Sequence, residues 1–257
     1  MKKLLLTAIA VTVFSAPALA APPPAVFNWT GFYIGAEGGA GWASSQTTAL
    51  SFQEIFGGAV VASGSFGPGL QNSSRLSGGF GGGTVGFNRQ SGAFVFGLEG
   101  DISGVSMTGT SDCSTTYGGI FGPAAGTSSC DNKLTFLATG TGRLGWAVDH
   151  TLFYLKGGGA WAHFQHDAAG QVVNPTGPWL ASTGDDRAGY TIGGGIEYAF
   201  WGNWSAKVEY DYMGFGTKNL SMSFEKPANA TFIINVRDRE IVQAIKAGVN
   251  YRFNWGG

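Results

Sequence analysis

The C-terminal segment carries the feature that constrains the fold most, an unbroken alternation of apolar and non-apolar residues from Ile245 to Trp255. A period of two is typical of a β-strand whose two faces meet different surroundings. The apolar face becomes aromatic toward its end, at Tyr251, Phe253 and Trp255, as in a transmembrane strand with an aromatic girdle at the membrane interface. Such a strand must close a barrel, because an open sheet edge in hydrocarbon leaves backbone N–H and C=O groups without partners.

The N-terminal segment predicts export. Lys2 and Lys3 precede an apolar run, which ends in a small-residue site at Ala18-Leu19-Ala20, and this is the arrangement of a secretory signal peptide. The apolar run is shorter than the ~20 residues that a spanning helix needs. We therefore expect cleavage near Ala20.

The predicted cleavage divides the chain into three parts. Residues 1–20 are the signal peptide, residues 21–27 a proline-rich lead-in, and residues 28–257 the barrel. Of the 15 basic residues, 13 remain after cleavage, against 16 acidic ones, for a net charge of −3. Without a basic patch, nucleic acid is not an expected partner.

Seven further segments show a strand pattern. They are residues of about 28–42, 75–89, 93–107, 131–148, 151–166, 185–199 and 203–216. The clearest is the last, in which Trp204, Val208 and Tyr212 share one phase and Lys207 lies in the other. In the glycine-rich segment 75–89 the apolar residues change phase after Phe80, which predicts a β-bulge.

The connections between these segments alternate in length. Turns of about three residues alternate with long polar stretches, and these stretches are residues 43–74, 108–130, 167–184 and 217–235. Short periplasmic turns, long external loops and an even strand number are typical of outer-membrane barrels. The predicted fold is therefore all-β: an eight-stranded, antiparallel, up-and-down transmembrane β-barrel with four long external loops, in the outer membrane of a Gram-negative cell.

The charged residues of the strands lie in the phase opposite to the aromatic residues. The interior of an eight-stranded barrel is just wide enough for side chains to fill, and buried charges must be paired. We therefore predict a salt-bridge network in the lumen. Its acidic members are Glu37, Glu99, Asp101, Glu197, Glu209 and Asp211, and its basic members are Arg143, Lys156, Lys207, Lys246 and Arg252.

The only two cysteines, Cys113 and Cys130, lie in one predicted external loop. In an exported chain an isolated pair is most simply a disulfide bond. The bridge would close a ring worth roughly 3 kcal/mol in the chain-entropy model. Two free thiols are the alternative.

Two motifs resemble a known family. The opening N-W-T-G-F-Y-I-G-A-E-G-G of residues 28–39 and the ending A-G-V-N-Y-R-F of residues 247–253 closely resemble the alphaproteobacterial outer-membrane immunogenic proteins, a porin-like family of eight-stranded barrels. The resemblance implies a structural envelope protein and surface antigen without a reaction or a cofactor. Its implied partners are outer-membrane lipid and lipopolysaccharide, the barrel-assembly machinery through the C-terminal strand, and host or envelope molecules at the external loops.

Two other functions stay open. A small porin-like channel is the stronger alternative, and conductance would identify it. An outer-membrane barrel enzyme would need a Ser/His or Asp/His cluster at the outer rim. His163, His166 and Asp167 lie near that rim, but no activated serine motif or paired carboxylates are evident around them. His163 and His166 also fall on opposite faces of a strand, so we expect no metal pair there.

Overall fold

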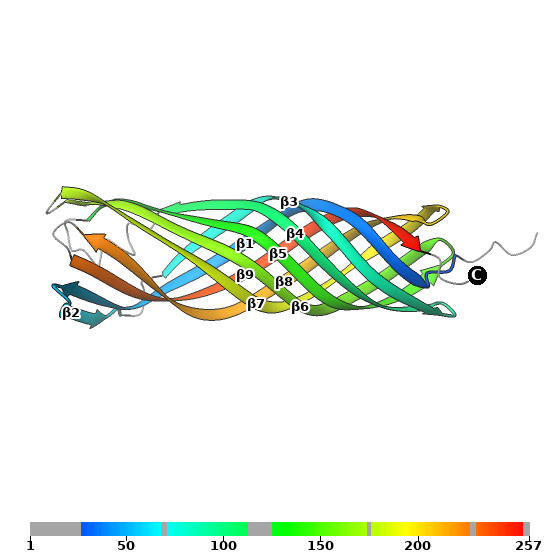
Figure 1. The fold of residues 1–257 in the computed structure, drawn as a ribbon, viewed down its shortest axis with the longest axis horizontal. Helices are drawn as coiled ribbons and strands as arrows, with labels where there is room; N and C mark the ends of the chain where they lie inside the picture. Colours follow the sequence, from blue (N-terminus) through cyan, green and yellow to red (C-terminus); the bar gives the residue numbers. More distant parts are fainter. Residues whose placement is uncertain (1–26, 68–70, 113–124, 174–175, 227–229, 254–257) are drawn as a thin grey trace, which may run out of the picture.

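The computed structural model describes residues 27–67, 71–112, 125–173, 176–226 and 230–253, and these form one antiparallel sheet rolled into an elongated barrel with steeply tilted strands (Figure 1). Among the described residues, no helix is long and apolar enough to cross a membrane. The strands are β1 (Gly31–Phe56), β2 (Ala59–Ser65), β3 (Gln71–Ser91), β4 (Phe94–Asp112), β5 (Ala125–Val148), β6 (Thr151–Val173), β7 (Thr176–Trp201), β8 (Trp204–Lys226) and β9 (Ala230–Phe253).

Eight of the strands make the ring. Each pairs with its neighbour in sequence from β3 to β9, and β1 pairs with both β3 and β9, which closes the barrel. β2 is an additional strand at the end of the barrel away from the three two-residue turns. We call this the outer end and the end with the turns the inner end. Among the described strands β2 pairs only with β1, over the segment of β1 that begins at Ser51, just beyond the last β1–β3 pair, Thr48 with Gln71. The predicted eight-stranded, up-and-down ring is thus the architecture observed.

The strands are longer than the sequence predicted, and the prediction of four long loops was in part wrong. Most of residues 43–74, 167–184 and 217–235 belongs to the outer parts of β1, β3, β6, β7, β8 and β9 or to β2. The alternation of apolar residues fades there, because the outward face no longer meets lipid, whereas backbone pairing continues. The remaining predicted loop is residues 108–130, and its residues 113–124 lie outside the described residues.

The inner end of the barrel has three two-residue turns, after β3, β5 and β7. Each contains a residue in the left-handed region: Gly92 (φ 61°), Asp149 (φ 51°) and Gly202 (φ 51°). Tight hairpin turns require such positive φ values, since their twist then matches that of the strands. The short turns therefore lie where the sequence predicted them.

The outer parts of β7 and β8 separate from each other. Their pairing runs from Trp201 with Trp204 to Tyr190 with Gly214 and ends there. Beyond that point the Lys218 ammonium links β8 to β7 through the Asp185 carboxylate and the Asp186 carbonyl oxygen. Side-chain contacts therefore connect β7 and β8 where their backbone pairing has ended.

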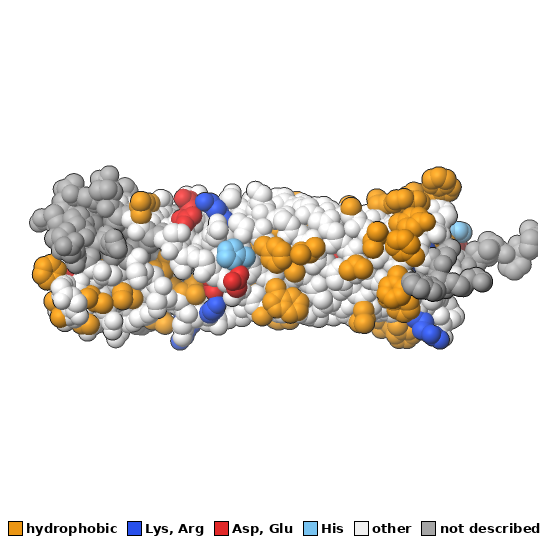
Figure 2. Space-filling model, viewed as in Figure 1, with side chains coloured by type: hydrophobic (Ala, Val, Ile, Leu, Met, Phe, Trp, Pro, Cys, Tyr) orange, Lys and Arg blue, Asp and Glu red, His pale blue; other side chains and the backbone are white. Residues whose placement is uncertain are grey.

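Outward-facing apolar side chains form what we call the apolar belt. Figure 2 shows them between the middle of the barrel and the end that carries the turns, with charged side chains beyond the belt's edge. Members include Phe32, Trp42, Leu98, Ile102, Leu144, Trp161, Tyr190, Ile196, Trp204, Val208 and Ile245. Beyond the belt, outward positions on β9 are Arg237 and Arg239, both exposed. A belt of this kind is the surface that meets hydrocarbon in a membrane barrel.

The lumen is filled in layers, which can be followed on the inward side of β6. From the inner end outward they are Leu152 and Tyr154 in an apolar base, Lys156 in a charged layer, Ala160, Ala162 and Phe164 in an apolar layer, His166 in a polar layer, and Ala168 in an outer apolar layer. Phe80 packs against the central apolar layer. No register shift occurs near it in the pairing with β1 or β4, so the predicted bulge is wrong, and Phe80 faces the lumen in an ordinary strand.

Candidate functional site

Ten of the eleven residues predicted to form the lumen network lie in one buried cluster, which we call the lumen charge cluster. Its members are Glu37, Glu99, Asp101, Arg143, Lys156, Glu197, Lys207, Glu209, Asp211 and Lys246. Lys246 Nζ on β9 lies 3.3 Å from Glu37 on β1, 2.9 Å from Glu209 on β8 and 3.0 Å from Asp211. Because each ammonium faces several carboxylates from different strands, the cluster links strands across the lumen.

Lys156 and Lys207 occupy the centre of the cluster. Lys156 Nζ lies 2.6 Å from Glu209 and 3.1 Å from Glu99. Lys207 Nζ lies 3.0 Å from Glu37 and 3.5 Å from Glu99. Side chains of both lysines and of Glu99 and Glu209 are fully shielded from solvent. Such charges are tolerated because they are paired.

Arg143 joins the charge cluster to the aromatic base below it. Its guanidinium lies 2.5 Å from Glu197 and 3.5 Å from Glu99 and donates a hydrogen bond to the Tyr33 hydroxyl. It also lies over the ring of Tyr154, 3.5 Å from the centroid, where a cation is attracted by the ring quadrupole.

Arg252 lies apart from the lumen charge cluster, unlike the prediction. It donates a hydrogen bond of 2.6 Å to the Asn28 carbonyl oxygen and lies over the rings of Phe27 and Trp29. Its phase was correct, since it is buried on the inward side, but at the inner mouth the chain that leads into β1 supplies its partners. Trp29 is buried in the inner apolar cluster and Phe27 packs against it, so the residues just before β1 fill that end of the lumen.

Two sequence predictions cannot be placed. Cys113 lies outside the described residues, so its bridge to Cys130 stays a prediction. Cys130 itself is buried in the outer apolar layer. The predicted signal peptide and residues 21–26 of the lead-in also lie outside the described residues.

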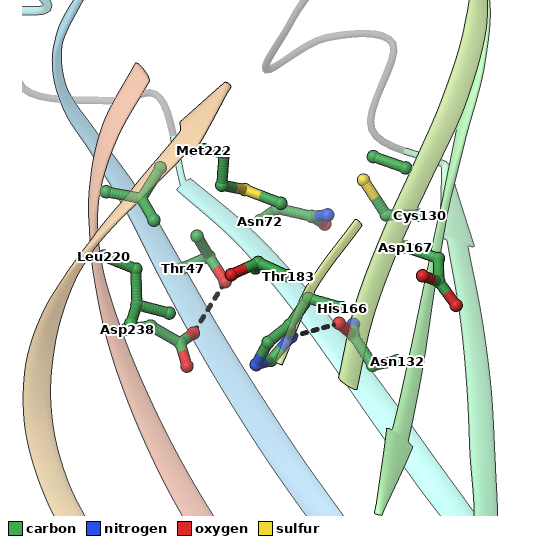
Figure 3. A pocket seen from close by; sticks show the side chains of 12 residues that line it. Thr47, Asn72, Cys130, Asn132, His166, Asp167, Thr183, Leu220, Met222 and Asp238 are labelled. Atoms are coloured by element: carbon green, nitrogen blue, oxygen red, sulfur yellow. Dashed lines mark hydrogen bonds between the residues drawn. The ribbon is translucent and has the colours of Figure 1, made fainter. Parts of the chain in front are cut away.

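A second polar group, which we call the outer cluster, lies beyond the central apolar layer. Its members are His166, Asp185, Arg187, Asp238 and Glu240, all buried. A pocket of about 30 Å³ opens above it, lined by side chains of β1, β3, β5, β6, β7, β8 and β9, with His166 and Asp238 at its base (Figure 3). The volume suits an ion with a few waters, whereas drug-sized ligands occupy about 300–1,000 Å³.

His166 is held by Asn132. Nδ1 of His166 lies 2.7 Å from Oδ1 of Asn132, as the dashed line in Figure 3 shows. The amide oxygen of Asn132 accepts a hydrogen bond, so Nδ1 carries the hydrogen and Nε2 keeps its lone pair. Nε2 is buried and has no hydrogen-bond partner among the described residues. Burial also lowers the pKa of His166, which favours the neutral ring.

Asp238 is tied to Arg187. The Arg187 Nη2 atom lies 2.6 Å from Asp238 Oδ2, and its Nε lies 2.5 Å from Asp185 Oδ2. Thr47 and Ser45 donate hydrogen bonds of 2.7 and 3.2 Å to Asp238 Oδ1. These bonds use three of the roughly four acceptor positions of a carboxylate, which leaves one on Oδ2.

Glu240 has no such partner. It is 1 % exposed, and neither of its carboxylate oxygens has a hydrogen-bond partner at bonding geometry among the described residues. Its polar neighbours are Ser45 and Asp238, and burial together with the Asp238 charge raises the pKa of Glu240 to about 9. The outer cluster therefore has an unbalanced acidic site.

The outer cluster was missed because the alternation was traced only from Ile245 onward and residues 217–235 were predicted to be a loop. The signal was present, since Val236, Asp238 and Glu240 continue the inward phase of Lys246 and the intervening Arg237 and Arg239 point outward. Extending the alternation past the apolar belt would have placed both carboxylates in the lumen. His163 and His166 do lie on opposite faces: His163 bonds Asp186 on the outside, and His166 faces the lumen.

Comparisons with known proteins agree with this geometry. Residues 6–253 match the family model of the outer membrane protein beta-barrel domain. The chain is 28 % identical over 250 residues to the 31 kDa outer-membrane immunogenic proteins of Brucella melitensis biotype 1 and Brucella suis biovar 1, covering 95 % of this chain and 91 % of each relative.

The solved structures that the chain matches have little sequence in common with it. The attachment invasion locus protein Ail of Yersinia pestis is 9 % identical with a TM-score of 0.34, covering 86 % of this chain and 99 % of that one. Neisserial surface protein A is 14 % identical with a TM-score of 0.33, covering 87 % and 98 %.

Proposed function

The chain belongs to the outer membrane protein beta-barrel domain family, and from this premise we propose that it is a structural protein and surface antigen of the Gram-negative outer membrane. It contributes to envelope integrity through its packed barrel and to surface interactions through the outer parts of its strands. The observation that carries the proposal is the filled lumen. Side chains of the lumen charge cluster and of the apolar layers pack the barrel interior, so that it resembles the core of a structural protein.

The outer ends of the strands support the antigen role. Strands of 23 to 26 residues exceed the ~9–11 residues that cross a bilayer. The surplus lies beyond the apolar belt and includes the hairpin of β1 and β2, in which every residue from Phe56 to Ser65 except Gly64 is exposed. The Brucella relatives carry the word immunogenic in their names.

The proposed partners follow from the surfaces. Outer-membrane lipid contacts the apolar belt and lipopolysaccharide surrounds the region just above it, where exposed Arg237 and Arg239 suit its anionic groups. The barrel-assembly machinery would bind β9, the strand that closes the ring. Host or envelope molecules would meet the outer ends of the strands.

We propose no enzymatic reaction. Acyl transfer or proteolysis needs a nucleophile or activated water aligned with a base that a third group orients. In the hydrogen bonds of the described residues, His166 bonds the amide of Asn132 and no hydroxyl. The outer cluster is thus built differently from a nucleophilic relay.

A pair of epitope insertions tests the surface role. A tag placed in the Gly57-Gly58 turn, where a Cβ added at either glycine would meet nothing within 4 Å, should bind antibody on intact cells. The same tag in the Gly202-Asn203 turn should bind only after permeabilisation. Cells that lack the protein should become more sensitive to detergent, and expression of the unmodified chain should restore them. Reversed tag accessibility, or unchanged sensitivity, would contradict the proposal.

The channel alternative makes a different prediction for the purified protein in planar bilayers. We expect no steady conductance, because the cavity beside Asp101 and Lys246 holds only about 10 Å³, the size of a single water. The edge-to-face pair Phe164 and Phe215, 5.6 Å apart between ring centroids, blocks the next layer. A variant with both replaced by glycine serves as the opened control and should conduct more. Uniform single-channel steps from the unmodified protein would establish the channel instead.

A further inference from the structure

The charges of the outer cluster do not balance. Asp185 and Asp238 share Arg187, and Asp185 also has the Lys218 ammonium. The third carboxylate, Glu240, makes no ion pair with a lysine or arginine of the described residues. A buried carboxylate without a counter-charge costs several kcal/mol and is normally neutralised by a proton or a cation.

The atoms around Glu240 have the composition of a cation site. One ligand atom each of His166, Asp238 and Glu240 lies within 4.8 Å of the other two. Ligand atoms that share a tetrahedral Zn²⁺ at about 2.1 Å stand roughly 3.4 Å apart, so a movement of about 1 Å completes the set. Figure 3 shows His166 and Asp238 at the base of the pocket, facing each other from different strands.

The hydrogen bond to Asn132 prepares His166 for this role. Metal-binding histidines usually donate the second ring N–H to an oxygen, which fixes the tautomer and the ring orientation. Here Nδ1 donates to Asn132, and the free Nε2, on a side chain only 8 % exposed, is the atom left for a metal. Asp238 keeps one acceptor position on Oδ2, and Glu240 keeps both oxygens.

We propose that His166, Asp238 and Glu240 bind a divalent first-row transition metal, with Zn²⁺ as the representative ion, and that Asn132 is the outer-shell residue that orients His166. Imidazole together with carboxylate favours ions of this class, whereas Mg²⁺ and Ca²⁺ prefer oxygen ligands alone. The ion supplies the positive charge that Glu240 lacks, and pocket waters complete its coordination. Because His166 is on β6 and both acids are on β9, the ion joins strands that are not neighbours in the ring.

The direct test is zinc titration of the full mature protein in detergent after removal of metals with a chelator, followed by calorimetry and by metal analysis after dialysis. We expect one saturable Zn²⁺ per chain, retained in excess Mg²⁺. Asn132→Leu should weaken binding about 10–100-fold, as loss of outer-shell partners does. His166→Gln and Glu240→Gln should weaken it more than that range.

Matched controls separate the site from adventitious binding and from misfolding. His163→Gln removes the exposed histidine on the same strand, paired with Asp186 on the outer surface, and should leave Zn²⁺ affinity unchanged. Glu240→Gln keeps the size of the side chain and removes the unbalanced charge, so it should assemble, as judged by a gel-mobility shift on heating. Absence of saturable zinc binding, or binding lost in His163→Gln and kept in His166→Gln and Glu240→Gln, would overturn the proposal.

Discussion

Replacing Arg143 with alanine is expected to destabilise the folded barrel by about 3–5 kcal/mol, because it leaves buried carboxylates without their partner. Arg143 is 3 % exposed and neutralises Glu197, from which it lies 2.5 Å, and also Glu99. The substitution also removes the cation above the Tyr154 ring. Urea unfolding in lipid vesicles measures the loss, and the temperature at which the folded gel band disappears should fall with it.

Lys133→Ala is the matched control for the Arg143 variant. Lys133 also pairs with a carboxylate, Asp167, at 3.3 Å, but the side chains are 45 % and 38 % exposed. Exposed pairs contribute about 0–1 kcal/mol, so this variant should unfold almost as the unmodified protein does. Equal losses in the two variants would show that the lumen charges are solvated separately, as in a wet channel.

Val208→Arg is expected to cost about 2–4 kcal/mol, the cost of an arginine on the lipid face at the bilayer midplane. Val208 is 59 % exposed and lies on β8 between Trp204 and Tyr210, which are also outward-facing. The neighbouring inward position is Lys207, which is 1 % exposed. The assembled fraction in outer membranes and the unfolding free energy in vesicles both report the loss.

Leu180→Arg is the control for Val208→Arg, because it places the same residue at an outward position that faces water instead of lipid. Leu180 is on the outer part of β7, paired with Ala169, and is 76 % exposed. It lies beyond the apolar belt, so arginine there should change the stability by no more than about 0.5 kcal/mol, as at an ordinary surface site. A large loss at Leu180, or none at Val208, would mean that the belt has been placed wrongly along the barrel.

The sequence predicted the part of the fold that the bilayer dictates. Lipid requires an apolar outward face, so the alternation of Val208 with Lys207 reveals both the strand and which of its faces points outward. The same phase placed ten of the eleven charged residues in the lumen charge cluster. It did not reveal their pairings, because each ammonium meets carboxylates from several strands, as Lys246 does with Glu37 and Glu209.

Outside the bilayer this signal is lost. The outer parts of the strands have polar residues on the outward side and a mixed interior, so residues 217–235 look like a loop although β8 and β9 pair through most of them. Phe80 was misassigned for a related reason, since an apolar side chain in the lumen imitates a change of phase. Arg252 could not be assigned because its partners, Phe27, Asn28 and Trp29, lie before the first residue of β1 and show no strand alternation.

The pairing of β1 with β9 means that closure of the barrel is a late step in its folding. The Glu37–Lys246 pair spans 209 positions of sequence and the Ser45–Asp238 hydrogen bond 193, so neither can form until the last strand has been synthesised and brought back to the first. Contacts so distant in sequence incur the loop-closure entropy before they contribute any stability, and topologies that depend on them fold slowly. Until closure, the edge of β1 that pairs with β9 is open, so the nascent barrel has to be protected for as long as its final strand is missing.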